Sequence, residues 1–222
     1  MDLQALAAAL VATALGLLVP RAIALLPEPA GAEEKESYVA VARRRGLGPG
    51  CGVAGLLLGY AVLARLGHHP VAWVVVLLTP VLLLLTVVDW RTRLLPRVVV
   101  LPATGVLLVL AVLEWLLGGS GGDLVRALAG MLIARSAFWL LWWIRRAGMG
   151  FGDVRLAALV GLVLGRLGWP AWFVGMYAGL LVFAVFGISL AAARRDRGIL
   201  KRAYPYGPFM VLGLYAGVLL AR

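Results

Sequence analysis

The sequence predicts an all-α fold: a polytopic transmembrane helix bundle of about eight spans, with both termini on the non-cytoplasmic side. Three observations support this fold class. Apolar residues make up 63% of the 222 residues and charged residues only 14%, against about 45–50% and about 25% in a soluble domain. The apolar residues form long uninterrupted runs, and the basic residues gather in alternate loops. A water-soluble fold of this composition would expose large apolar patches, so we expect the chain to fold in a bilayer.

Eight apolar segments are candidate spans, because a helix needs about 20 apolar residues to cross the hydrocarbon core. The first segment has no basic residue before it, so it does not resemble a signal peptide. The fifth carries Arg135, which we expect to face the bundle with Glu114 or Asp123 as its partner. The sixth and eighth are short. The eight segments are 3–26, 50–66, 70–88, 98–117, 124–144, 154–164, 169–193 and 208–221.

The segment between the first two spans, residues 27–49, is the one sizeable stretch that is not apolar. It carries Glu28, Glu33, Glu34 and Glu36, which we expect to be solvated, followed by three arginines. Such a short stretch cannot build a core of its own. We therefore expect a short cytoplasmic loop and a single membrane-embedded domain over 1–222. In the second span, Gly55 and Gly59 have the spacing that permits close helix packing.

The loop charges indicate the orientation of the spans. Four alternate loops, with the residues that flank them, hold 16 of the 21 basic residues. Basic residues accumulate on the cytoplasmic side of membrane proteins, where anionic lipids attract them. The net charge of +11 therefore indicates contact with an anionic membrane surface. Nucleic-acid binding is the weaker interpretation, because no single basic patch is present.

Two carboxylates lie where this orientation predicts the cytoplasmic ends of spans. Asp89 directly follows an apolar run, and Asp153 follows the glycine-rich stretch Gly148–Gly152. An ionisable residue at membrane depth is a functional candidate. Two carboxylates held close together share one proton, so one can act as a base on water while the other acts as an acid toward a carbonyl group. Structural roles remain open: Asp153 could cap a helix, and Asp89 could pair with a loop arginine.

Three stretches resemble motifs of the type IV prepilin peptidase family, the GxGD-type aspartic membrane proteases. The first runs from Asp89 through Leu94-Leu95-Pro96 to Leu101-Pro102. The second is the glycine-rich stretch from Gly148 to Asp153, continued by Val154 and Arg155. The third, Tyr204-Pro-Tyr-Gly-Pro-Phe209, resembles the family's Pro-Phe-Gly-Pro at the start of the last span. All three lie on the predicted cytoplasmic face, in the family's order.

The resemblance implies an aspartic endopeptidase of the bacterial inner membrane, active at the cytoplasmic face. Its substrates would be prepilins or pseudopilins of type IV pilus or protein secretion systems, whose short basic leader it removes. Asp89 and Asp153 would be the catalytic pair. The site would be shaped by Gly148, Gly150, Gly152, Pro96 and Arg155, and Pro205, Gly207 and Pro208 would line the substrate entrance. We expect Gly150 and Gly152 to permit a tight turn and the close approach of a substrate strand. Pilus or secretion assembly components would be further partners.

This chain departs from the family pattern in two respects. Many members carry a cysteine-rich zinc domain after the first span, which is linked with N-methylation that uses S-adenosylmethionine. Cys51 is the one cysteine here, so we expect no metal and no cofactor, and N-methyltransferase activity is in doubt. Arg97 stands where an acidic or amide residue follows Leu-Leu-Pro, and Arg155 stands where lysine is usual. The residues alone also permit a small ion-coupled transporter, a non-catalytic scaffold of a pilus or secretion machine, or a protease with another substrate.

Overall fold

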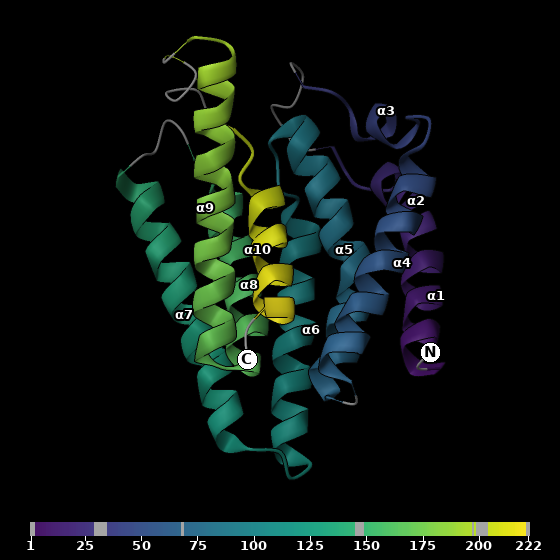
Figure 1. Ribbon diagram of the computed structural model, residues 1–222, viewed down its shortest axis with the longest axis vertical. Coiled ribbons are helices and arrows are strands. Elements are labelled where there is room, and N and C mark those ends of the chain that lie inside the picture. Colours follow the sequence, from purple (N-terminus) through teal and green to yellow (C-terminus); the bar gives the residue numbers. More distant parts are fainter. Residues whose placement is uncertain are drawn as a thin grey trace. The chain divides into compact units, whose positions relative to one another are not determined.

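The computed structural model describes residues 3–28, 35–67, 69–144, 149–196, 198 and 204–220. The regular secondary structure of these residues is helical, without a strand, which confirms the all-α prediction. The helices are α1 (Leu3–Leu17), α2 (Val19–Ala24), α3 (Tyr38–Ala42), α4 (Leu47–Leu66), α5 (Pro70–Thr92), α6 (Arg97–Leu116), α7 (Gly121–Ile144), α8 (Phe151–Leu167), α9 (Trp169–Ala193) and α10 (Gly207–Leu220) (Figure 1).

Each predicted span corresponds to helical structure. The first is divided at Leu18 into α1 and α2, because Pro20 lies in the first turn of α2, where its missing N–H is tolerated. Among the described residues, six stretches are long and apolar enough to cross a membrane; α1 and α2 together form one of them. The predicted short spans correspond to α8, with 17 residues, and α10, with 14 residues. The placement of both termini outside stays a prediction.

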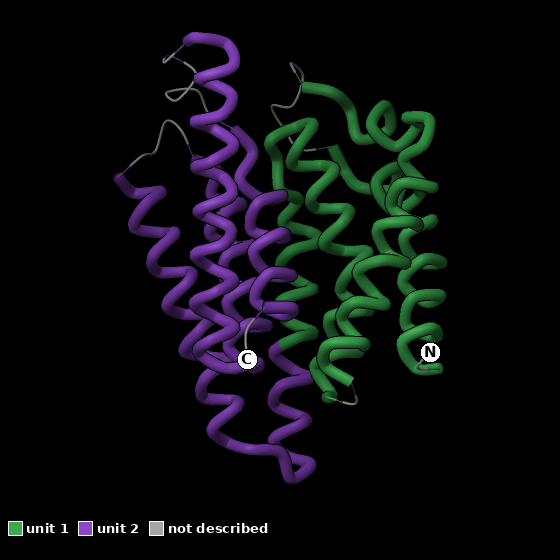
Figure 2. Tube along the Cα trace, in the orientation of Figure 1, with its two compact units in different colours: residues 1–107 green, residues 108–222 purple. Residues whose placement is uncertain are grey.

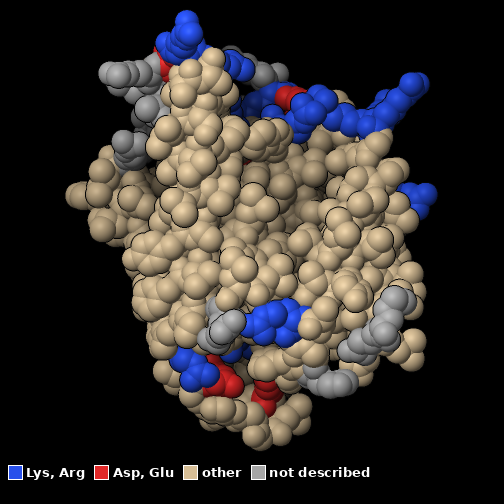
Figure 3. All heavy atoms as spheres, viewed as in Figure 1, with Lys and Arg blue, Asp and Glu red and all other residues tan. Residues whose placement is uncertain are grey.

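The chain divides into two compact units, residues 1–107 and residues 108–222 (Figure 2). The first contains α1 to α5 and the start of α6. The second contains the rest of α6 and α7 to α10. The single domain predicted over 1–222 stays a prediction. Within each unit, charged side chains gather toward the helix ends, and uncharged side chains cover the helices between them (Figure 3).

In the first unit, α1 and α4 run antiparallel with their backbones in close contact. A Cβ atom added at Gly16 would lie 2.5 Å from the carbonyl oxygen of Cys51, and one at Gly59 would lie 2.9 Å from that of Ala8. Gly55 faces Ala12 in the same way. The predicted Gly55–Gly59 packing motif therefore lies inside the unit. Helix α5 packs on both α1 and α4.

The second unit is built from antiparallel pairs with the same type of contact. Gly130 of α7 faces Gly161 of α8, and a Cβ atom at Gly161 would lie 2.5 Å from the carbonyl oxygen of Gly130. That oxygen also accepts a 3.0 Å hydrogen bond from the indole Nε1 of Trp172. Helices α9 and α10 meet at Gly175 and Gly213. The ends that meet at one side of this unit are therefore the C-termini of α7 and α9 and the N-termini of α8 and α10.

The predicted loop 27–49 is tied to the first unit by its own side chains. Glu28 accepts a 2.6 Å hydrogen bond from the backbone N–H of Tyr38, a side chain that is 1% exposed. Burial and the charge of Glu28 raise the pKa of Tyr38. Glu36 pairs with Arg44. Glu28 is exposed and Glu36 partly exposed, as expected, and each also has a partner in this unit. Glu33 and Glu34 lie outside the described residues.

The ion pairs of the second unit correct the partner expected for Arg135. Asp123 pairs with Arg126, and Glu114 pairs with the buried Arg166. Arg135 is exposed. It lies 12 residues beyond Asp123 on the same helix, which is about 18 Å along the axis, whereas Arg126 is one turn away.

The glycine contact between α7 and α8 predicts the effect of adding a single methyl group. We expect Gly161→Ala to lower the free energy of unfolding by about 1–3 kcal/mol, because two backbones would have to separate. The matched control is Gly105→Ala in α6, where an added Cβ atom meets nothing within 4 Å. Alanine is the better helix former, so this control should be neutral or stabilising. Thermal unfolding in detergent tests both, and equal effects would contradict the close contact.

Candidate functional site

Asp89 lies in the last turn of α5 and is 4% exposed. Its carbonyl oxygen accepts a 2.8 Å hydrogen bond from the backbone N–H of Arg93, which ends the helix. The neighbouring Thr92 hydroxyl donates to the carbonyl oxygen of Val88 at 2.8 Å and accepts from the N–H of Leu94 at 3.3 Å. The backbone on both sides of Asp89 is therefore hydrogen-bonded, which fixes the turn that carries its carboxylate.

The turn after Asp89 changes the chain direction within four residues. Arg93 has a left-handed backbone, with φ 53°, which costs a residue other than glycine about 1 kcal/mol. Pro96 is buried, and its carbonyl oxygen accepts from the N–H groups of Val99 and Val100 at 3.0 and 3.2 Å. Pro96 therefore anchors the start of α6. The side chain of Arg97, the departure noted above, is exposed.

Asp153 lies in the first turn of α8 and is 8% exposed. Its backbone N–H donates to the carbonyl oxygen of Gly150 at 3.2 Å. The N-terminus of a helix carries partial positive charge, which favours a negative group there. Helix α8 is buried along most of its length against α7, α9 and α10. The carboxylate thus lies at one end of the central helix of its unit.

The described glycines before Asp153 do not have a left-handed backbone. Gly150 has an extended backbone, with φ −75°, and Gly152 is not among the glycines with positive φ. A Cβ atom at position 150 would lie 4.0 Å from Oδ2 of Asp153, which is an ordinary van der Waals distance. The role expected of these glycines in the approach of a substrate strand stays a prediction. Gly148 lies outside the described residues.

Arg155 lies two residues after Asp153 and contacts an aromatic ring. Its guanidinium carbon lies 5.0 Å from the centre of the Phe151 ring, one turn away. Phe151 in turn meets the Trp142 ring edge-on at 5.1 Å. A cation over an aromatic face is weakly stabilised, so Arg155 orders the first turn of α8.

The residues predicted to line an entrance, Pro205, Gly207 and Pro208, are all buried at the start of α10. Tyr206 between them lies among aromatic rings, 5.4 Å from Phe138 and 5.0 Å from Phe183. Its carbonyl oxygen accepts from the N–H groups of Phe209 and Met210, at 3.0 and 3.1 Å. An entrance role for the two prolines and the glycine stays a prediction.

Tyr206 also interacts with Asp153, a relation that sequence reasoning missed. Burial, and after it the charge of Asp153, raise the pKa of the Tyr206 phenol above its ordinary value. Tyr206 is therefore a protonated hydroxyl at neutral pH. The signal in the sequence was the tyrosine itself, which stands where the family motif has phenylalanine.

Each aspartate lies at the basic end of its own unit. In the first unit, every described basic residue except Arg65 belongs to the end where α5 finishes and α4 begins. In the second unit, Arg155, Arg194 and Arg195 lie at the end of Asp153. The arginines of the opposite end, Arg126 and Arg166, are paired with carboxylates. Both units thus place a buried carboxylate at the end that carries excess positive charge.

The raised pKa of Tyr206 predicts a loss of stability in alkali. Below pH 10 the phenol is protonated in both states; above it the unfolded chain loses a proton that the folded protein retains. The free energy of unfolding therefore falls with rising pH, by about 1.4 kcal/mol per pH unit for one group. We expect Tyr206→Phe to make this fall shallower in unfolding measured in detergent. The exposed Tyr177→Phe is the control, and an unchanged slope in Tyr206→Phe would contradict the prediction.

The sequence matches the type IV leader peptidase family over residues 76–192, more than half of the chain, and this segment includes Asp89 and Asp153. A prepilin leader peptidase/N-methyltransferase of Aeromonas salmonicida is 35% identical over 147 residues, which cover 64% of this chain and 47% of the relative. The protein of that name from Aeromonas hydrophila is 34% identical over 167 residues, covering 73% of this chain and 54% of the relative.

A third relative with the same name, from Pseudomonas putida, is 32% identical over 171 residues, covering 73% of this chain and 55% of its own length. The chain spans about half the length of these curated relatives. No solved structure matches it. The six membrane-length stretches and these relatives identify an integral membrane protein. With this extent of similarity, the chain belongs to the type IV leader peptidase family.

Proposed function

We propose that this protein is an aspartic endopeptidase that removes the short basic leader from type IV prepilins or pseudopilins, with Asp89 and Asp153 as its catalytic pair. One observation carries the proposal: each carboxylate is buried at the basic end of its own helical unit. Both also lie inside the segment that matches the family. The names of the curated relatives support the substrate class.

The chemistry requires one proton shared between two carboxyl groups. The ionised member takes a proton from a water molecule, whose oxygen attacks the carbonyl carbon of the scissile peptide bond. The protonated member gives its proton to the carbonyl oxygen. When the tetrahedral intermediate collapses, a proton passes to the leaving nitrogen and the peptide bond breaks. The two groups titrate as a pair, so the roles belong to the pair rather than to either residue.

The location of the carboxylates favours hydrolysis over ion transport. A coupling-ion site is expected near the middle of the bilayer, whereas Asp89 and Asp153 each lie in a terminal turn of a helix. We place the basic ends of the units at the cytoplasmic face of the inner membrane, by the positive-inside rule. A basic leader would meet the carboxylates from that side. Components of the pilus or secretion machine would receive the product.

The neighbouring residues take supporting roles in this proposal. Gly150 and Gly152 leave room for the substrate backbone beside Asp153, and Gly148 joins them through the family resemblance alone. Pro96 fixes the turn that follows Asp89, and Arg155 fixes the first turn of α8. The start of α10, with Pro205, Gly207 and Pro208, forms the wall along which the substrate enters.

The proposed hydrolysis uses no metal and no cofactor, because the carboxyl groups supply both acid and base. Methyl transfer is outside the proposal. The resemblance links that activity with a cysteine-rich zinc region, and one cysteine cannot supply the ligands of such a site.

The proposal predicts the effect of removing either carboxylate. We expect Asp89→Asn and Asp153→Asn each to reduce cleavage of a prepilin by about three orders of magnitude or more, as when a catalytic group is lost. The measurement is the initial rate of leader removal by purified protein in detergent, with the cut site identified by mass spectrometry.

Asp123→Asn is the matched control, since it removes a carboxylate from the opposite end of the second unit. It should cleave at close to the parent rate. If the folded asparagine variants at 89 and 153 cleave as well as this control, the catalytic assignment is wrong.

A further inference from the structure

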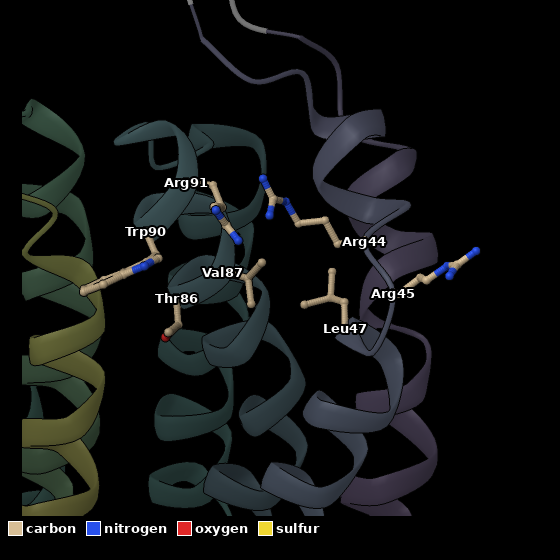
Figure 4. A pocket seen from close by; sticks show the side chains of 7 residues that line it. All are labelled: Arg44, Arg45, Leu47, Thr86, Val87, Trp90 and Arg91. Atoms are coloured by element: carbon tan, nitrogen blue, oxygen red, sulfur yellow. The ribbon is translucent and has the colours of Figure 1, made fainter.

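The first unit contains a cavity of about 320 Å³ that the proposed reaction does not use. It lies at the basic end of the unit, between the segment that leads into α4 and the last turns of α5. Three arginines, one tryptophan and three smaller side chains line it: Arg44, Arg45, Leu47, Thr86, Val87, Trp90 and Arg91 (Figure 4). A volume of this size is at the lower end of the range for ligand pockets.

Two of the arginines face each other across this cavity. Figure 4 shows the guanidinium groups of Arg44 and Arg91 pointing toward one another, while Arg45 points away. Arg44 is held in this orientation by Glu36, which accepts hydrogen bonds from its Nε and Nη2 at 3.0 and 3.1 Å. Arg91 and Val87 are one turn apart on α5, so they share the helix face that lines the cavity.

The charge of the cavity favours an anion. The guanidinium groups of Arg44 and Arg91 face it, and among the described residues Glu36 is the carboxylate that pairs with Arg44. Glu36 compensates the charge of Arg44, so Arg91 supplies the excess positive charge, and an anion between the two groups can accept charge-assisted hydrogen bonds from Arg91 and from the N–H groups of Arg44 that Glu36 leaves free. Guanidinium groups present paired donors whose geometry matches phosphate oxygens. The electrostatics therefore select a phosphate-type ligand.

The cavity is also amphipathic along the axis of α5. Arg91 is near the end of a membrane-length helix, whereas Val87 is one turn deeper and Leu47 is the first residue of α4. Trp90, 47% exposed, is the residue type that membrane proteins place at the headgroup level. A ligand here would meet cations toward the aqueous phase and apolar side chains toward the hydrocarbon. That gradient matches a phospholipid and not a free ion.

We infer that this cavity binds the phosphate headgroup of an anionic phospholipid. Arg44 and Arg91 hold the phosphate from two sides, and the start of an acyl chain runs along Leu47 and Val87. The cavity is too small for a whole lipid, so only the headgroup and the start of an acyl chain enter. A bound lipid would also fix the last turn of α5, which carries Asp89; this consequence rests on the proposed function, whereas the binding itself does not.

The test is a lipid titration of the whole protein, followed by native mass spectrometry in detergent. We expect one phosphatidylglycerol molecule to bind more tightly than phosphatidylcholine. In Arg44→Gln/Arg91→Gln, the apparent affinity for phosphatidylglycerol should fall about 30-fold, from the typical contribution of a basic residue at an anionic membrane surface. Arg21→Gln/Arg43→Gln removes the same charge from exposed positions outside the cavity and should change the affinity less than twofold.

Three outcomes would overturn the inference. Equal losses in the two double variants would mean that lipid binds to a diffuse basic surface. Equal binding of phosphatidylglycerol and phosphatidylcholine would remove the charge selection. Displacement of the lipid by glycerol phosphate at equal concentration would make a free phosphate the ligand.

Folding of each variant is checked by thermal unfolding. Should the cavity double variant not fold, Arg91→Gln alone carries the test, with an expected loss of about fivefold. The readout is bound lipid and not cleavage. A failure of this inference is thereby distinguished from a failure of the proposed function, which the asparagine variants at 89 and 153 report.

Discussion

Backbone contact between antiparallel helices at glycine is the interaction on which both units depend. In lipid the surroundings are as apolar as leucine, so burying apolar side chains does not drive helices together. Close van der Waals contact between the backbones drives them together, and it requires that no Cβ atom lies between the two helices. Gly16 against Cys51, Gly130 against Gly161 and Gly175 against Gly213 meet this requirement in three helix pairs. The direction of each pair then determines which helix ends meet.

The charges follow from that arrangement. At the end of each unit where Asp89 or Asp153 lies, basic residues outnumber acidic ones among the described residues. At the opposite end of the second unit, Arg166 and Arg126 are matched by Glu114 and Asp123. A buried arginine without a carboxylate would carry a large desolvation cost. Excess positive charge at one end, with paired charges at the other end of the second unit, gives the units a polarity that a membrane surface can recognise.

The last two turns of α5 carry both a proposed catalytic residue and part of the cavity lining. One face carries the buried Asp89, and another, with Val87 and Arg91, lines the cavity toward Arg44. A ligand in the cavity and a substrate at Asp89 would therefore both contact a helix end whose left-handed residue, Arg93, stops it from extending further. In the second unit Tyr206 has a comparable position, because it links the start of α10 to the carboxylate of Asp153.

The sequence by itself determined the fold class, the helix positions and the two candidate aspartates. Composition and loop charges decide these, because the bilayer admits few alternatives to helices with charged ends. Only the tertiary structure decided the partners: Glu28 with Tyr38, Glu36 with Arg44, and Glu114 with Arg166 instead of Arg135. It also brought Arg44 to face Arg91. The physical reason is that pairings across helices depend on which residues the close glycine contacts bring to the same depth, and spacing along the chain does not contain that information.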